Sequence, residues 1–283
     1  MHSAQVPIPE NGGFVNQMKR ILNSSLRRKI GLASMTLIAA VYVIPRVGSD
    51  TTSIQAALLP AVVSAGSQSD ATSAGWDLSN IDNSRVDSWV ELFTTHPKLK
   101  PRFAIWLERK STYQPMISAK LEERAMPQDL IYLAMIESGF NPKAKSPKAA
   151  GGLWQFISET GQRYGLTVNK RVDERNHPDK ATDAALSYLS DLYDRFGSWY
   201  LAAAAYNTGE NRVGRIMREM TGKERGTDQD YYRISSRLPR ETRDYVPMMI
   251  AAARISKDPQ KYGFGTTSVT TTDVTTTDVT MTE

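Results

Sequence analysis

The chain has 283 residues, enough for one sizeable domain with appendages. Hydrophobic residues make up 40% of it, which is typical of a globular core. It contains no cysteine, which excludes disulfides and thiol catalysis, and its three scattered histidines do not predict a zinc site. The formal net charge of +5 belongs to residues 1–46, so the rest of the chain is balanced and gives no support for nucleic-acid binding.

The N-terminus has the pattern of an export signal. A basic stretch ends at residues 27–29, and the uncharged run 30–44 follows it. This run is short for a membrane-spanning helix and typical of a signal core. A second apolar run ends in small residues at 63–65, which fit a cleavage site. Residues 1–65 are therefore either a cleaved signal or a retained anchor in which residues 30–44 associate with the membrane. In both cases the positive charge predicts export of the bulk of the chain.

A polar stretch and a helical stretch come next. Residues 66–84 are rich in Ser, Asp, Ala and Asn and predict a linker. Residues 85–126 show helical periodicity and predict a helical extension. Its apolar residues form three successive stripes, which are more often core than sugar platform: Val86, Trp89, Val90 and Phe93; Phe103, Trp106 and Leu107; and Tyr113, Met116, Ile117 and Leu121.

The next predicted helix, which begins at Pro127, carries an acid on its apolar stripe. Leu130, Leu133 and Glu137 lie at i, i+3 and i+7, so the carboxylate lies on the face expected to meet the core. Gly139 ends the helix, so the helix dipole also disfavours negative charge at Glu137. Desolvation and the dipole both raise the pKa of this carboxyl group. A carboxyl group that is protonated near neutral pH can act as the general acid that cleavage of a glycosidic bond requires.

The loop that follows bears on the role of Glu137. The alternative to catalysis is a glutamate that reaches solvent or pairs with Lys143 or Lys145. Two prolines in residues 141–147 break any helix, and Gly151-Gly152 lets the backbone approach a neighbour or ligand closely. A polar, glycine-rich loop beside a buried acid predicts the wall of a cleft.

The stretch 136–156, IESGFNPKAKSPKAAGGLWQF, resembles the Glu-Ser and Gly-Leu-(Met/Trp)-Gln motifs of soluble lytic transglycosylase (SLT) domains. It is most similar to the membrane-bound murein transglycosylase D group, and the resemblance extends upstream to about Val86. It implies a mainly α fold, with a lysozyme-like helical SLT domain at 127–264 after the helical extension. Because the motifs all lie beyond Arg85, a protein that begins there is expected to be soluble and active.

The next polar loop offers further acids. Asp173 and Glu174 are candidates for a second catalytic carboxylate, but Arg171 and Arg175 beside them favour a charge cluster within the loop. A scaffold helix is predicted to begin at Thr182 and to end at residue 197, and a short helix is predicted at 212–220, followed by a solvated loop at 222–228.

Two later stretches also resemble the family. The segment 199–206, WYLAAAAY, ends in Tyr206 and Asn207, which resemble the Ala-Tyr-Asn motif at the floor of the glycan cleft. The segment 238–255 resembles the closing motif, which implies that Tyr245 hydrogen-bonds the catalytic carboxyl group and that Glu241 contacts the sugar or peptide of the substrate. The alternatives are an ordinary helix end and an ordinary buried helix face. Residues 265–283 repeat Thr-Thr-Asp-Val and predict a disordered tail.

The resemblance implies a mechanism with one acid. Glu137 would protonate the β-1,4 bond between N-acetylmuramic acid and N-acetylglucosamine in peptidoglycan, and would then take the proton of the muramoyl 6-hydroxyl, which closes into a 1,6-anhydro end. The other residues implied to orient the acid or hold the sugars are Ser138, Ser146, Gln155, Tyr206, Asn207, Glu241 and Tyr245.

The expected partners are peptidoglycan glycan strands in the periplasm or cell envelope, and the protein is expected to be a monomer that needs no metal and no cofactor. Two other functions stay open. One is a lysozyme-like hydrolase, which needs Asp173 or another acid opposite Glu137. The other is a non-catalytic glycan-binding domain.

Overall fold

The computed structural model describes residues 75–265. The predicted signal or anchor, residues 66–74 of the predicted linker and residues 266–283 of the predicted tail lie outside the described residues. Within the described part the secondary structure is helical, apart from isolated bridges such as Lys145 with Gly151. The expectation of a mainly α fold is confirmed. None of the helices in this part is both long and apolar enough to cross a membrane.

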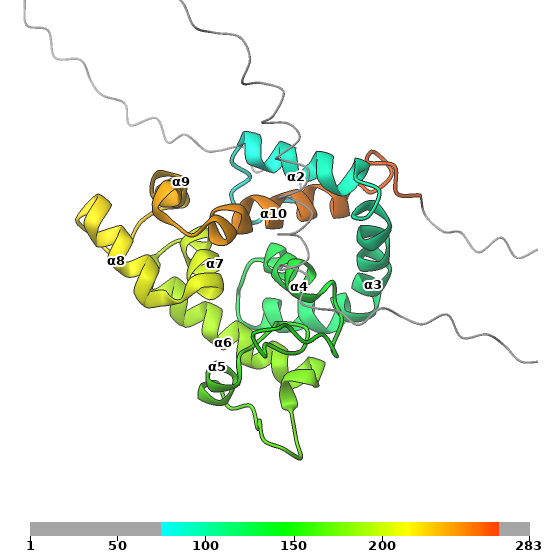
Figure 1. Ribbon diagram of the computed structural model, residues 1–283, viewed down its shortest axis with the longest axis horizontal. Coiled ribbons are helices and arrows are strands. Elements are labelled where there is room, and N and C mark those ends of the chain that lie inside the picture. The colour runs from blue at the N-terminus through cyan, green and yellow to red at the C-terminus, as the bar shows by residue number, and fades with distance from the viewer. Residues whose placement is uncertain (1–74, 266–283) are drawn as a thin grey trace, which may run out of the picture.

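The helices follow one another with short connections, except between α4 and α6 (Figure 1). In chain order they are α2 (Ser84–Thr95), α3 (Lys100–Glu123), η1 (Gln128–Leu130), α4 (Ile131–Ser138), α5 (Ser158–Arg163), η2 (Glu174–Asn176), α6 (Pro178–Phe196), α7 (Trp199–Thr208), α8 (Glu210–Thr221), α9 (Asp228–Ile234), η3 (Ser235–Arg237) and α10 (Arg240–Lys257).

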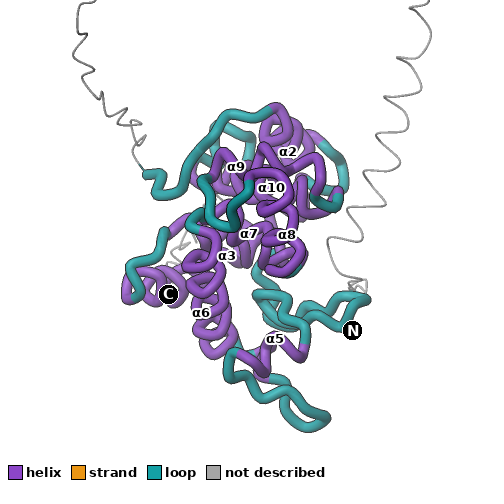
Figure 2. The backbone as a smooth tube through the Cα atoms, turned by 90° about the vertical axis from the view of Figure 1, so that its left-hand side faces the viewer, coloured by secondary structure: helices purple, strands orange, loops and turns teal. Residues whose placement is uncertain are grey.

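Helices α4, α7 and α10 form the centre of the domain. Helix α10 packs against α2, α4 and α7, and α7 packs against α6, α8 and α9 (Figures 1 and 2). Residues 131–136 of α4 and 200–205 of α7 are buried on every side. A helix that is apolar all round belongs inside a domain, so α4 is a core helix and not the one-faced helix that its stripe predicts. The four alanines of α7 leave room for its neighbours to pack closely.

Several helix boundaries differ from the prediction. The second and third apolar stripes belong to the single helix α3, which continues through Pro115. Helix α6 begins at Pro178, four residues before Thr182, because proline suits a first turn and the His177 side chain accepts a hydrogen bond from the backbone N–H of Lys180. Helix α9 was not predicted and follows directly on the predicted loop.

Part of the predicted linker, residues 75–83, packs on the domain, which corrects that boundary. The carboxylate of Asp77 accepts hydrogen bonds from the backbone N–H groups of Gln128 and Asp129, where the chain enters η1. The hydroxyl group of Tyr200 donates to a carbonyl of the same segment. The composition of this stretch is that of a linker, but its few anchoring residues contact partners far away in the sequence.

Candidate active site

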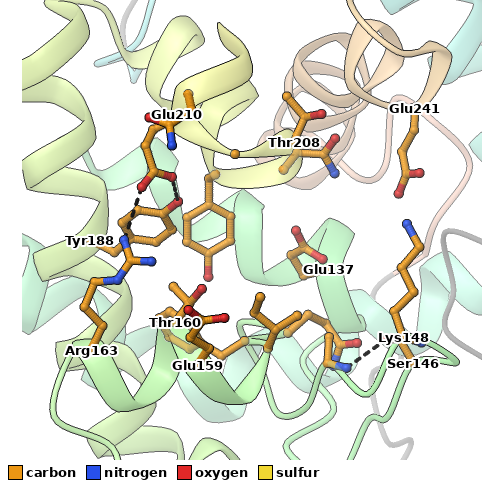
Figure 3. Close-up of a pocket in the computed structure, with 18 residues that line it drawn as sticks. Glu137, Ser146, Lys148, Glu159, Thr160, Arg163, Tyr188, Thr208, Glu210 and Glu241 are labelled. Carbon is orange, nitrogen blue, oxygen red and sulfur yellow. Dashed lines mark hydrogen bonds and ion pairs between the residues drawn. The ribbon is translucent and has the colours of Figure 1, made fainter. Parts of the chain in front are cut away.

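A cleft of about 480 Å³ lies where the ends of α4, α7 and α10 meet the loop after α4 (Figure 3). Residues from α5, α6 and α8 complete its walls. The predicted site residues that line it are Glu137, Ser146, Gln155, Tyr206, Asn207 and Glu241. These residues span more than a hundred positions of the chain, and the fold brings them together in one cleft.

Glu137 lies in the last turn of α4 and points into the cleft (Figure 3). The helix ends at Gly139, which has a φ of 60°, and a Cβ atom there would lie 2.1 Å from the indole nitrogen of Trp106. Only glycine tolerates both this conformation and this contact. The glycine therefore fixes where the helix stops, and with it the position of Glu137.

The pKa of Glu137 is raised to about 7, chiefly because the carboxyl group is removed from solvent. The hydroxyl group of Tyr245 donates a 2.6 Å hydrogen bond to Oε1 of Glu137 and pulls the pKa down, whereas the negative charge of Glu241 pushes it up. The predicted contact of Tyr245 is thus present. The alternative partners Lys143 and Lys145 form no ion pair with Glu137.

Tyr206 forms part of the cleft floor and is held from below. Its hydroxyl group donates a 2.8 Å hydrogen bond to the carbonyl of Trp154, and the indole N–H of Trp154 donates to the hydroxyl group of Thr182 at 3.0 Å. Burial, and then the charge of Glu137, raise the pKa of Tyr206 well above its usual value. Tyr206 therefore stays protonated. Its hydrogen bond to Trp154 holds the ring in one orientation.

Two side-chain amides face the cleft with one end already bonded. The NH₂ group of Gln155 donates to the carbonyls of Ala144 and Gly152, at 3.1 and 2.9 Å. The amide carbonyl of Asn207 accepts a 2.8 Å hydrogen bond from the hydroxyl group of Thr242. Gln155 is thereby left with an acceptor for a ligand, and Asn207 with a donor.

The two serines of the motif differ in position. Ser146 lines the cleft, where its Oγ accepts hydrogen bonds from the backbone N–H groups of Lys148 and Ala150 and shapes the loop tip; no hydrogen bond joins it to Glu137. Ser138 does not line the cleft, because successive helical residues turn by about 100°. Its hydroxyl group donates a 2.8 Å hydrogen bond to the carbonyl of Leu153. Ser138 thus ties α4 to the loop, and of its two expected roles, orienting the acid or holding the sugars, this position is compatible with the first.

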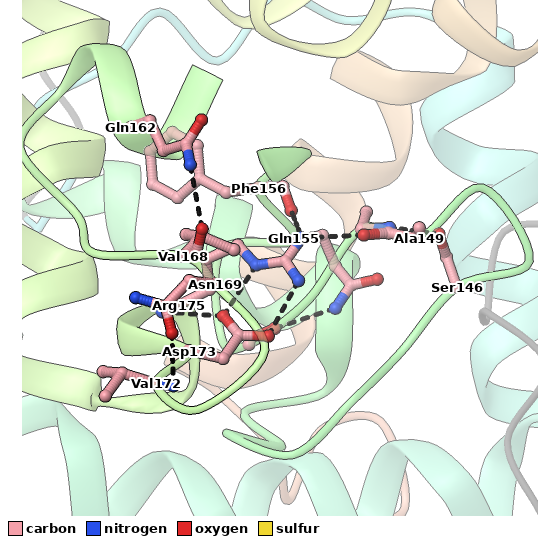
Figure 4. Close-up of polar contacts among 12 residues, drawn as sticks. Ser146, Ala149, Gln155, Phe156, Gln162, Val168, Asn169, Val172, Asp173 and Arg175 are labelled. Atoms are coloured by element: carbon pink, nitrogen blue, oxygen red, sulfur yellow. Dashed lines mark hydrogen bonds and ion pairs between the residues drawn. The ribbon is translucent and has the colours of Figure 1, made fainter. Parts of the chain in front are cut away.

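Arg175 supports the loop that forms the cleft wall (Figure 4). From the sequence it was expected only to be a charge beside Asp173 and Glu174. The buried guanidinium donates to the carbonyls of Ala149 and Phe156, at 2.7 and 3.0 Å. Asp173 holds the guanidinium from the other side at 2.8 Å, and this bond lowers the pKa of Asp173. No signal in the sequence points to this role, because the partners of Arg175 are backbone carbonyls about 20 residues away.

The two candidates for a second carboxylate are therefore outside the cleft. Asp173 is occupied by Arg175, and Glu174 pairs with Lys180 at 2.5 Å. The expected pairing within the loop is present for Asp173, which bonds Arg175, whereas the partner of Glu174 is Lys180 in the first turn of α6. Within residues 75–265, no group of three or more His, Asp or Glu side chains is arranged to hold a metal ion.

Charged residues lie at both ends of the cleft, and of these only Glu241 was predicted from the sequence; Lys148, Arg163 and Glu210 were not. At one end, the carboxylate of Glu210 accepts hydrogen bonds from Arg163 and from the hydroxyl group of Tyr188, at 3.1 and 3.0 Å. At the other end, Lys148 and Glu241 point toward one another (Figure 3). These residues lie on α5, α6, α8, α10 and the loop after α4, which meet only in the folded domain, so sequence spacing does not connect them.

Part of the chain is similar in sequence to a known family of domains. Residues 114–228 match the Transglycosylase SLT domain family. Over 156 residues, 55% of this chain, the sequence is 39% identical to the membrane-bound lytic murein transglycosylase D of Escherichia coli K12, and the match covers 34% of that protein. It is 32% identical over 124 residues to the soluble lytic murein transglycosylase of Salmonella typhimurium, which is 42% of this chain and 19% of that protein.

Among solved structures, the 70 kDa soluble lytic transglycosylase of Escherichia coli aligns with a TM-score of 0.45 and 22% identity, over 63% of this chain and 33% of that one. The chain matches about a third of the length of the Escherichia coli transglycosylase D. Residues 114–228, which match the SLT domain family, contain Glu137, the loop after α4 and the Tyr206-Asn207 end of α7. Residues 114–228 therefore match a transglycosylase SLT domain, and the chain is similar in sequence to lytic murein transglycosylases over about half of its length.

Proposed function

We propose that this protein is a peptidoglycan lytic transglycosylase. It cleaves the β-1,4 bond between N-acetylmuramic acid and N-acetylglucosamine without consuming water and leaves 1,6-anhydromuramoyl ends. The observation that carries the proposal is Glu137, a cleft carboxyl group with a pKa near 7 that a buried tyrosine holds in place. A group with this pKa exists in both protonation states near neutral pH, so it can give a proton and then take one.

In the proposed reaction Glu137 acts first as an acid. Its proton goes to the glycosidic oxygen, which leaves as the hydroxyl group of N-acetylglucosamine. The resulting carboxylate then takes the proton of the muramoyl 6-hydroxyl, whose oxygen bonds to the anomeric carbon, so Glu137 ends the cycle protonated as it began. The hydrogen bond from Tyr245 stabilises the carboxylate between these two steps.

The other cleft residues hold the sugars in this proposal. The acceptor of Gln155 and the donor of Asn207 fit the hydroxyl and acetamido groups of an amino sugar, and the ring of Tyr206 forms an apolar floor. Ser146 keeps the loop tip at the cleft edge. Glu241 contacts the sugar or its peptide.

Hydrolysis is the competing reaction, because a water molecule in place of the 6-hydroxyl would leave reducing ends. A hydrolase normally uses a second carboxylate for this step. Asp173 is held by Arg175 outside the cleft. Among the other acids that line the cleft, Glu241 is the one whose charge acts on Glu137, so it is the acid that this reaction would use. Glu241 replaces Asp173 as the residue to substitute if hydrolysis is observed.

The remaining parts of the proposal concern the cell. The substrate is the glycan strand of peptidoglycan, which lies in the cell envelope, and the protein is exported there by its N-terminal region. Residues 30–44 either are removed with the signal or keep the protein at the membrane. The SLT domain works as a monomer.

The products test the reaction directly. We expect muropeptides released from purified sacculi to end in 1,6-anhydro-N-acetylmuramic acid, lighter by one water than reducing ends and resistant to borohydride. An oriented internal hydroxyl group has an effective molarity on the order of 10⁵ M or more, so it outcompetes water. Mass spectrometry before and after borohydride treatment distinguishes the two kinds of end. Mostly reducible ends would contradict the proposal.

Glu137→Gln is the matching substitution. It should abolish release of muropeptides, whereas Glu108→Gln on the exposed face of α3 should leave release unchanged. Circular dichroism should show that Glu137→Gln melts no lower than the wild type at pH 8, because ionising a carboxyl group whose pKa is raised costs stability above its ordinary pKa. Activity of Glu137→Gln above a tenth of the wild-type rate would exclude Glu137 as the acid, and full loss of catalysis with unchanged biological function would favour a glycan-binding role.

A further inference from the structure

Thr242 occupies a junction between three helices next to the cleft. It lies in the first turn of α10 and is only 1% exposed. Its neighbour Glu241 lines the cleft, and Tyr245, one turn further on, bonds Glu137. Thr242 itself does not line the cleft. Its side chain instead reaches α7, where its hydroxyl group donates a 2.8 Å hydrogen bond to the amide carbonyl of Asn207.

In the structure this hydrogen bond holds the carbonyl end of the Asn207 amide. The carbonyl and NH₂ ends of an asparagine side chain are almost equal in size, so shape alone does not decide which end faces a ligand. With the carbonyl of Asn207 bonded to Thr242, the NH₂ end is the one presented to the cleft. An NH₂ group can only donate, so the cleft offers a fixed donor at this point.

The backbone of Thr242 is also held in place. Pro247 lies inside α10 and has no N–H group, so the carbonyl of Arg243 lacks its usual helical donor four residues on. The buried hydroxyl group of Tyr231, from α9, replaces it and donates to the carbonyls of Arg243 and Thr242, at 2.9 and 3.1 Å. Thr242 is thus anchored to α9 through its main chain and to α7 through its side chain.

We infer that Thr242 is a positioning residue that acts through Asn207 and presents the NH₂ group of that side chain to a carbonyl oxygen of the substrate. In an N-acetylated sugar this acceptor is the acetamido carbonyl, a stronger and more directional acceptor than a ring or hydroxyl oxygen. The inference rests on the proposed function, because it takes the amino-sugar strand as the ligand of the cleft. Thr242 touches no substrate atom.

A double-substitution cycle tests this inference. Thr242→Val keeps the shape of the side chain and removes the hydroxyl group, and it should lower kcat/KM on solubilised glycan strands about tenfold, the loss expected for one hydrogen bond. Thr242→Ser restores the hydroxyl group and should stay within about threefold of the wild type. In an Asn207→Ala protein, Thr242→Val should cause less than a twofold further loss, since there is no amide left to orient.

Two further variants separate positioning from general packing. Ser256→Ala removes another buried hydroxyl group from the same helix, one that contacts the sulfur of Met135 at 3.6 Å, and should leave kcat/KM unchanged. Asn207→Asp keeps an oxygen for Thr242 but has no NH₂ group, so it should lose as much activity as Asn207→Ala. This variant also tests the inference if Thr242→Val fails to fold.

Three outcomes would each overturn the inference. The losses of kcat/KM caused by Thr242→Val and Asn207→Ala could multiply in the double variant, Thr242→Ser could fail to restore activity, or the Asn207→Asp protein could be as active as the wild type. The same cycle can be measured as binding of the Glu137→Gln protein to sacculi, with no turnover. A wild type that leaves reducible ends contradicts the proposed reaction while the binding cycle still reports on Thr242. Anhydro ends together with a multiplicative cycle contradict Thr242 alone.

Discussion

Three influences meet at Glu137, and they do not all have the same sign. Removal from solvent raises its pKa most, the hydrogen bond from Tyr245 lowers it, and the negative charge of Glu241 raises it again. Two of these influences come from a single helix, α10, whose residues follow Glu137 by more than a hundred positions. The pKa near 7 is therefore a balance that one substitution on α10 can move in either direction.

Opposite shifts in the pH dependence of the reaction are expected from Tyr245→Phe and Glu241→Gln. The first reaction step needs protonated Glu137, so the rate falls as the pH rises through its pKa. Tyr245→Phe removes a bond that favours the carboxylate, which raises the pKa and moves this fall to higher pH. Glu241→Gln removes a like charge, which lowers the pKa and moves the fall to lower pH.

Initial rates of muropeptide release measured from pH 5 to 9 give the position of the fall, with Glu108→Gln as the matched surface control. The maximal rate of Tyr245→Phe should also drop about tenfold, because the carboxyl group loses its orienting bond. Shifts of both variants in the same direction would show that Glu137 is not the group whose titration limits the rate.

At the scale of elements, the features that the sequence predicted are those with local causes. Glycine at the end of α4 and the prolines of the next loop act on their own neighbours, so both the position of Glu137 and the break after it could be predicted. The start of α6 at Pro178 also has a local cause, but the helix was predicted to begin at Thr182, just before its apolar stripe. Arg175 could not be predicted, because its role depends on carbonyls that only the folded loop brings to it.

The cleft loop packs so closely against Arg175 that adding one methyl group at Gly152 should disturb it. A Cβ atom at Gly152 would lie 1.7 Å from the carbonyl oxygen of Arg175, and Gly152 also has a φ of 81°. Gly152→Ala should therefore displace the loop and lower activity at least a hundredfold, since a small misplacement of binding residues has costs of about this size.

Gly165→Ala is the matched control, because Gly165 has a φ of 86° and open space around its Cβ position. It carries only the conformational cost, about 1 kcal/mol, and should keep nearly full activity. Thermal melting and muropeptide release measured on both variants separate the two effects. Equal behaviour of the two proteins would mean that the contact with Arg175 does not hold the loop.

For the molecule as a whole, α10 is held at both ends, and the segment 75–83 holds the end far from the cleft. The guanidinium of Arg254 contacts Asn80 and Asp82, at 2.8 and 2.9 Å. Lys257 pairs with the buried carboxylate of Asp129 at 2.5 Å and lies 4.7 Å from the ring centre of Trp76. The composition of residues 75–83 does not predict these contacts, because their partners on α10 lie far away in the sequence.

These contacts change what a shortened protein should do. A protein that begins at Arg85 contains every cleft residue but loses the contacts of residues 75–83. Among them are two backbone hydrogen bonds to the carboxylate of Asp77 and the burial of Leu78. Hydrogen bonds to a charged group and a buried leucine together stabilise by about 3 kcal/mol after allowance for exposure. Compared with a protein that begins at Gly75, the shorter one should melt about 6–12 °C lower.

Activity and stability should separate in this comparison. The cleft contains no residue of the segment 75–83, so well below its melting temperature the shorter protein should release muropeptides at a rate within a few-fold of the longer one. Asp77→Ala in the full chain, which removes only the two hydrogen bonds near η1, should lower the melting temperature by a smaller amount. If the proteins that begin at Gly75 and at Arg85 had the same melting temperature, residues 75–83 would contribute nothing to the stability of the domain. If the shorter one folded but were inactive, the support that residues 75–83 give to α10 would extend along the helix to Tyr245 and Glu137.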